Sequence, residues 1–189
     1  TLIIFTSDNG GHGVIWDKFD TNGPLQGHKR DLTEGGIRVP FIARWPGEIT
    51  PGSTSDEVIA FQDMMPTFAQ IAGVKPPNDI DGISVVSVLS GKQLPTPHEY
   101  LYWDYGHCRE RYDQAVRMGK WKGIREGQEN PIQLYDLSED IGEEHNLAPQ
   151  YPDIVARIDQ IMEEAFIPSP RYPVGEKYQG GPIWIKENQ

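Results

Sequence analysis

The chain has 189 residues, of which 37% are hydrophobic and 24% are charged, and its formal net charge is −11 at pH 7. This length is enough for one sizeable domain, or for a domain with a small satellite. No apolar run approaches the roughly 20 residues that a membrane helix needs, and the negative charge repels phosphate backbones and anionic lipid, so we expect neither a nucleic-acid nor a membrane partner.

The first part of the chain has the pattern of an α/β layer. Residues 2–5 form a continuous apolar run, which predicts a strand buried on both faces of a mainly parallel sheet. Because the chain opens inside this strand, with Thr1 rather than Met, we expect that the beginning of the protein is missing. Polar residues follow at the carboxyl end of the strand, which is where ligands sit in open α/β sheets. Residues 10–36 are rich in glycine and lack a helical period, so we predict a long loop there and a second strand over 39–45.

Helices and short strands follow. Helical spacing of apolar residues predicts a helix over 62–72, capped by Gly73, and a shorter helix over 81–91. The composition then shifts toward aromatic residues, and three short strands are predicted within 100–138. A helix over 152–166 carries an apolar stripe that can cover these strands.

These elements predict the α/β class with three parts. Residues 1–92 would form part of a mixed or parallel sheet layer. Residues 93–165 would form a small α+β subdomain with an antiparallel sheet and a packing helix, and 166–189 a tail.

The segment SDNGG, residues 7–11, pairs an acid with an amide at the end of the first predicted strand. Asp8 and Asn9 offer a carboxylate and an amide carbonyl, which are hard oxygen ligands of the kind that calcium or magnesium takes. Two ligands do not complete a site, because calcium usually takes about six to eight oxygens. An Asp-Asn-Gly sequence is also a common turn. The residues by themselves leave both interpretations open.

Lys29 belongs to a second polar segment, GHKRDLTEGG. Its ammonium could hold a tetrahedral anion as a point charge, and Glu34 could orient it. A lysine beside an arginine is, however, commonly a solvated surface residue. The segment alone therefore does not establish an anion site.

Seven segments occur in an order and spacing that resemble the C-terminal part of the type I sulfatases, relatives of alkaline phosphatase. They are SDNGG, GPLQGHKRDLTEGGIRVPFIARWPG, DMMPTFAQIAG, DGISVVSVLSG, YLYWDYG, QAVRMGKWKGI and IQLYDLSEDIGEEHNLA. The resemblance covers residues 1 to about 165. It implies an alkaline-phosphatase-like sheet layer in which residues 1–92 are the C-terminal part of the catalytic domain. It also implies that Asp8 and Asn9 are two ligands of the active-site calcium and that Lys29 is a lysine that contacts the sulfate. Half of a metal site is thereby favoured over a simple turn.

The resemblance also implies what this sequence does not contain. The nucleophile of such enzymes is a formylglycine made from the cysteine of a C-x-P-S-R motif, whereas the single cysteine here, Cys108, lies in GHCRERY. We therefore expect the C-terminal fragment of a sulfatase that is inactive alone. Its expected partners are a sulfate ester, such as a sulfated carbohydrate, and the missing N-terminal part of its own fold. A periplasmic or secreted location is expected from the resemblance only.

Three histidines are candidates for contacting the substrate. His12 lies beside the predicted metal pair, His28 lies next to Lys29, and His107 lies in an aromatic segment that could reach the rim of a pocket. The alternative for each is a loop residue that bonds its own backbone or a solvated turn.

Two other functions stay open at this point. A phosphatase or phosphodiesterase of the same superfamily would have metal sites richer in Asp and His, and Asn9 disfavours it because an amide suits a single hard cation. The second alternative function is a non-catalytic module that binds a sulfated glycan or a protein. Trp103, Tyr105 and Trp121 could stack on a sugar ring, but alternating aromatic residues in short strands more commonly form a core.

Overall fold

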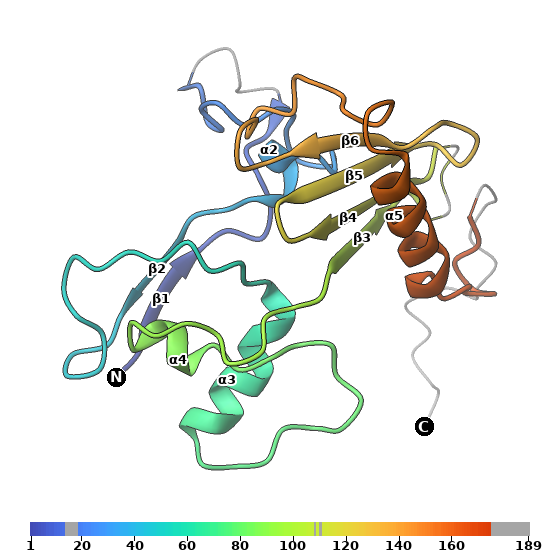
Figure 1. Ribbon diagram of the computed structural model, residues 1–189. Helices are drawn as coiled ribbons and strands as arrows, with labels where there is room; N and C mark the ends of the chain where they lie inside the picture. The colour runs from blue at the N-terminus through green and yellow to red at the C-terminus, as the bar shows by residue number, and fades with distance from the viewer. Residues whose placement is uncertain (14–18, 108, 110, 175–189) are drawn as a thin grey trace, which may run out of the picture. The chain divides into compact units, whose positions relative to one another are not determined.

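The computed structural model describes residues 1–13, 19–107, 109 and 111–174, and Figure 1 labels its elements. The chain forms two units: Thr1–Asp8 with Val39–Leu101, and Asn9–Arg38 with Tyr102–Gln189. The glycine-rich segment 9–38 thus belongs to the same unit as the C-terminal residues. The sequence instead suggests a domain boundary at residue 92, and that boundary stays a prediction. Among the described residues, none of the helices has the length and apolar character required to span a bilayer.

The strands of the first unit are an antiparallel pair. Strand β1 (Ile3–Thr6) pairs with β2 (Phe41–Arg44), so that Phe5 lies opposite Ile42. The prediction of a strand buried on both faces of a parallel sheet is wrong for the described residues. Exposure alternates along β1, and Ile3 and Phe5 are 54% and 64% exposed. The reason is that the first unit leaves the face of the sheet that carries these two residues open and covers the opposite face only partly.

The helical part of the first unit follows the predicted positions. A 3-10 turn, η2 (Phe61–Asp63), leads into α3 (Met64–Ile71), and Gly73 ends the helix with a φ of 69°. These bounds confirm the helix that was predicted over 62–72. The second predicted helix is shorter than expected: α4 covers only Val86–Leu89.

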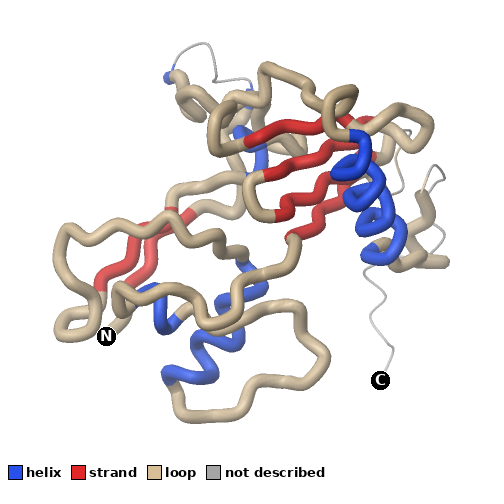
Figure 2. The backbone as a smooth tube through the Cα atoms, viewed as in Figure 1, coloured by secondary structure: helices blue, strands red, loops and turns tan. Residues whose placement is uncertain are grey.

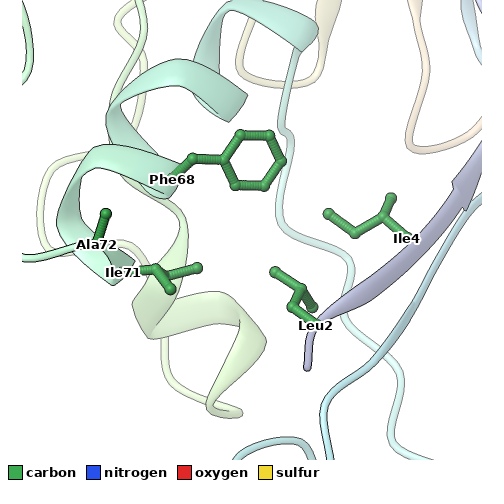
Figure 3. Close-up of a pocket in the computed structure, with 5 residues that line it drawn as sticks. All are labelled: Leu2, Ile4, Phe68, Ile71 and Ala72. Atoms are coloured by element: carbon green, nitrogen blue, oxygen red, sulfur yellow. The ribbon is translucent and has the colours of Figure 1, made fainter.

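Helix α3 and strand β1 face each other across an apolar hollow of about 300 Å³. Figure 3 shows that the side chains of Leu2 and Ile4 point toward Phe68 and Ile71 of the helix. This is the side of β1 that the first unit itself partly covers.

The second unit is built on a four-stranded sheet, drawn in red in Figure 2. Its order is β3 (Leu101–Tyr105), β4 (Asp113–Met118), β5 (Trp121–Glu126), β6 (Gln133–Asp136). Strand β5 pairs antiparallel with both β4 and β6. The predicted antiparallel sheet is therefore confirmed.

Helix α5 (Pro152–Ala165) packs on this sheet against β4. It begins with a proline, whose missing N–H costs nothing in the first turn. Ile158, Ile161 and Met162 are fully buried on its inner face, as the apolar stripe predicted.

The core of the second unit also includes the long loop and the aromatic residues. Leu32 from the loop belongs to the same buried cluster as Ala115 and Ile124 of the sheet, and Trp103 and Tyr105 pack against that cluster. The core interpretation of these two aromatic residues is thus confirmed. Trp121 instead packs on Tyr151, with ring centroids 4.8 Å apart.

Candidate active site

Within the second unit, residues 9–11 of the first polar segment lie beside the segment that contains Lys29. The Gly10 N–H donates a hydrogen bond to the Gly36 carbonyl at 2.9 Å, and the Lys29 N–H donates one to the Gly11 carbonyl at 2.9 Å. The Asn22 side chain holds the same turn closed, since its Oδ1 accepts from the Gly11 N–H and its Nδ2 donates to the Gly27 carbonyl. The two backbone bonds join residues 18 and 26 positions apart into one loop cluster, which we call the glycine loop (residues 9–13 and 26–38).

Close backbone contact explains the glycine at position 10. A β-carbon at Gly10 would overlap the carbonyl oxygen of Gly35, so only glycine permits this approach. Arg30, next to Lys29, has a φ of 88°, a left-handed conformation that costs a non-glycine residue on the order of 1–3 kcal/mol. Such strain is found where the surrounding structure fixes a local geometry, and functional sites are frequent examples.

The short helix α2 (Glu34–Ile37) closes the glycine loop, and its first residue has an unexpected partner. The Glu34 carboxylate accepts a hydrogen bond from Lys122 Nζ at 2.8 Å. The carboxylate of Glu34 is thus engaged by Lys122 rather than by Lys29, so the expected direct orientation of Lys29 by Glu34 is not what the described residues show. Its second oxygen lies 3.6 Å from Arg38 and 3.9 Å from Arg117.

Glu143 completes a buried ion cluster, which consists of Glu34, Lys122 and Glu143. Lys122 Nζ lies 2.8 Å from Glu143 Oε1, an ion pair without hydrogen-bond geometry, and Glu143 Oε2 accepts from the Glu34 N–H at 2.7 Å. The Lys122 and Glu143 side chains are 0% exposed, and that of Glu34 is 3% exposed. Burial raises the pKa of Glu143, while the Lys122 ammonium acts in the opposite direction. Sequence reasoning missed Lys122 and Glu143; the one available signal was that Lys122 lies two positions from the apolar Ile124 and so shares its face of the strand.

The predicted metal ligands contribute oxygen atoms of the right kind. Asp8 is exposed and ends the first unit, and Asn9, which is half-buried, begins the second. A carboxylate and an amide oxygen suit calcium in chemistry, but they are fewer than the six to eight oxygens, roughly, that the ion takes. Within the ranges that the structure describes, no group of three or more His, Cys, Asp or Glu side chains is placed to hold a metal.

His28 lies in the glycine loop beside Lys29. Its Nδ1 is 3.1 Å from Asp31 Oδ2 and 3.1 Å from the Lys29 carbonyl, and its ring lies against Gly13. His12, the neighbour of Gly13, is exposed. The structure therefore brings His28 and the segment of His12 to the same cluster as Lys29.

His107 has both ring nitrogens engaged elsewhere in the second unit. Nδ1 lies 2.8 Å from the Tyr172 carbonyl and Nε2 lies 3.2 Å from Asp104 Oδ2, while the ring packs edge-on against Tyr112. The Tyr172 carbonyl and then Asp104 raise the pKa of His107, because both favour the doubly protonated ring. Cys108, which adjoins His107, lies outside the described residues.

Comparisons with known proteins place this architecture in a family. Residues 27–166 match the family model described as N-sulphoglucosamine sulphohydrolase, C-terminal. The match covers most of the chain, and the chain belongs to this family of sulfatase C-terminal regions.

Individual relatives include sulfatases. Arylsulfatase A of Homo sapiens is 33% identical over 189 residues, which cover 86% of this chain and 37% of that protein. The structure of Ps i-CgsB in complex with k-i-k-neocarrahexaose is 28% identical with a TM-score of 0.76, covering 95% of this chain and 39% of that one. The structure of BT4656 in complex with its substrate D-glucosamine-2-N,6-O-disulfate is 27% identical with a TM-score of 0.69, covering 87% and 34%. The chain thus spans between 34% and 39% of the length of these relatives, and the predicted fold class is confirmed.

Proposed function

We propose that this chain is the part of a sulfuric ester hydrolase that supplies Lys29 to bind the sulfate group and Asp8 and Asn9 to bind calcium. The observation that carries the proposal is the hydrogen bonding of the Asn9–Gly11 segment to the Lys29 segment, through Gly10, Gly11 and Lys29 itself. This arrangement supports a shared site because a cation and an oxyanion must be held close together for one to neutralise the other.

The residues of the chain act by charge and position. The Lys29 ammonium would neutralise sulfate oxygens as negative charge develops on the leaving oxygen, and the glycine loop would hold it in place without reorganisation. Calcium, held by Asp8 and Asn9 with ligands from elsewhere in the complete protein, would add positive charge at the same oxygens, and formylglycine would supply the attacking hydroxyl. We place the formylglycine in another part of the complete protein, because the single cysteine of this sequence is not in a C-x-P-S-R motif.

We infer a sulfated carbohydrate as the substrate class. Two structural relatives were solved with carbohydrates, one with k-i-k-neocarrahexaose and one with its substrate D-glucosamine-2-N,6-O-disulfate. His12 and His28, which lie at the glycine loop, are the proposed substrate contacts closest to Lys29 in the chain. His107 is a weaker proposal, since its ring nitrogens already bond Tyr172 and Asp104.

We also propose that the chain works only with the rest of its own fold. Apolar side chains of Ile3, Phe5 and Ile42 are 54%, 64% and 62% exposed, although they sit on paired strands. Exposed apolar area of this kind marks a surface that another part of a protein covers. The isolated chain would then have one wall of the site and no nucleophile, and would be inactive.

The proposal is tested by Lys29→Ala in the complete protein, with 4-nitrophenyl sulfate as substrate. We expect kcat to fall by about 10² to 10³, which is the effect of removing one preorganised charged donor. Lys92→Ala is the matched control, since Lys92 is exposed and lies after α4. Equal rates for the two variants would contradict the role of Lys29.

A further inference from the structure

The buried ion cluster connects the glycine loop to the central strand β5 of the second unit. Lys122 comes from β5, Glu34 is the first residue of α2, and Glu143 follows β6. One ammonium thus contacts two carboxylates from different segments, at 2.8 Å each. Glu143 additionally accepts the backbone N–H of Glu34, so that Glu34 is held through both its side chain and its main chain.

Stability alone is a poor reason for such a cluster. Removing charges from water is costly, and well-packed apolar residues of similar volume are often as stable or more stable. What an ion cluster supplies is a directed geometry, since each oxygen must meet a particular N–H or ammonium. Two contacts fix the orientation of Glu34 in this way, one from Lys122 Nζ to its carboxylate at 2.8 Å and one from its N–H to Glu143 at 2.7 Å, and the ion pair between Lys122 and Glu143 joins these two partners to each other.

The orientation of Glu34 determines the position of the glycine loop. The next residue, Gly35, donates its N–H to the Gln26 carbonyl at 2.7 Å, which anchors the segment that leads to Lys29. The carbonyl of Gly36 accepts the Gly10 N–H at 2.9 Å, which anchors the segment that follows Asn9. Helix α2 therefore bonds to both parts of the proposed site, and the buried ion cluster bonds the start of α2 to β5, beside a longer ion pair of Glu34 with Arg117 of β4 at 3.9 Å.

We propose that Lys122 is a positioning residue for the sulfate-binding loop: through Glu34 it holds α2, and α2 holds Lys29 and the Asn9 segment in register. This inference rests on the proposed function, because it assigns Lys122 a role in the action of Lys29. Lys122 is fully buried and does not itself contact substrate in this scheme.

The test is a double-mutant cycle in the complete protein, with kcat/KM for 4-nitrophenyl sulfate as the readout. We expect Lys122→Met to lower kcat/KM by about 10- to 100-fold, the usual effect of removing a residue that orients an active-site group. In the Lys29→Ala background the same substitution should lower kcat/KM by less than about threefold, because the group that it positions is gone. An equal loss in both backgrounds would mean a general structural role and would overturn the proposal.

A second variant covers the case in which Lys122→Met does not fold, since it leaves two buried carboxylates without their ammonium. Glu34→Gln keeps the volume of the side chain and leaves Lys122 paired one to one with Glu143. We expect a loss of about tenfold in kcat/KM, again suppressed in the Lys29→Ala background. Unchanged kcat/KM in Glu34→Gln would overturn the proposal.

Amide hydrogen exchange gives a readout that does not require activity. Peptides covering 26–36 should exchange at least about tenfold faster in Glu34→Gln than in the parent protein, while peptides from β4 and β5 keep their rates, because the loss of anchoring is local. Lys120→Met is the matched control: Lys120 lies two residues from Lys122, but its side chain is 53% exposed and pairs with Asp136. Exchange that is unchanged in Glu34→Gln, or equally accelerated in Lys120→Met, would overturn the anchoring role.

The proposed function of Lys29 and the positioning role of Lys122 are contradicted by different results. Full activity in Lys29→Ala would contradict the proposed function while the exchange experiment still decides whether Lys122 anchors the loop. A defective Lys29→Ala with normal Lys122→Met and Glu34→Gln enzymes would contradict only the positioning role.

Discussion

Asp63 is the residue whose replacement tests the packing of the first unit most sharply. Its carboxylate is completely buried where η2 meets α3. Oδ2 accepts from the Ala60 N–H at 2.8 Å, Oδ1 accepts from the Ile83 N–H at 2.9 Å, and His98 Nε2 lies 2.9 Å from Oδ1. One side chain thus holds three segments together: the turn just before it, the segment 20 positions after it and the segment 35 positions after it.

The substitution Asp63→Asn preserves volume but replaces one acceptor oxygen by an NH₂ group. The two backbone N–H groups point at different oxygens, so one of them must face a second donor. A buried donor left without a partner costs about 1–3 kcal/mol, and the bonds that remain lose the benefit of a charged acceptor. We expect a decrease of about 2–4 kcal/mol in the free energy of unfolding.

The measurement is equilibrium urea unfolding of the parent protein, Asp63→Asn and the matched control Asp56→Asn. Asp56 is exposed, and surface substitutions of this kind usually change stability by no more than about 0.5 kcal/mol. A difference between the two variants of less than about 0.5 kcal/mol would refute the reasoning, because it would mean that the Asp63 bonds contribute nothing beyond those of a solvated carboxylate.

Two further predictions concern the second unit. Gly10→Ala should destabilise it by about 2–4 kcal/mol in the same unfolding assay. The new β-carbon overlaps the Gly35 carbonyl oxygen and breaks the hydrogen bond to Gly36. A cost below about 0.5 kcal/mol would show that the loop is not packed this closely. The raised pKa of His107 means that its protonated ring contributes stability fully below its ordinary pKa of 6.5, and that this contribution is lost as pH rises through the higher folded pKa. The stability of the parent protein should therefore fall more steeply than that of His107→Gln as the pH rises above 6.5, and parallel pH profiles would contradict the bonds to Tyr172 and Asp104.

Local sequence patterns predicted much of the fold. Apolar residues at helical spacing, together with Gly73, located α3 to within two residues, and the buried stripe of α5 matches Ile158, Ile161 and Met162. These features depend on neighbours within one or two turns of the chain, which is the range over which periodicity carries information. The alternation of exposure along β1 was missed because a continuous apolar run does not indicate which face lacks a cover.

The site was predictable only in part. The resemblance directed attention to Asp8, Asn9 and Lys29, and hydrogen bonds join the segments of Asn9 and Lys29. The partner of Glu34 could not be read from the sequence, because Lys122 is 88 positions away and Glu143 bonds the Glu34 backbone from 109 positions away. Pairings over such separations are set by the sheet register and by the path of the glycine loop rather than by any local motif.

The central claim is that Asp8 and Asn9 form part of a calcium site that works together with Lys29. Its most direct test is calcium titration of the complete protein by calorimetry, with Asp8→Ala and the control Asp56→Ala, followed by 4-nitrophenyl sulfate hydrolysis in the same samples. We predict that Asp8→Ala weakens calcium binding by at least about tenfold and lowers hydrolysis at limiting calcium, because the site loses a charged ligand. Equal calcium affinity in Asp8→Ala and Asp56→Ala would contradict the claim.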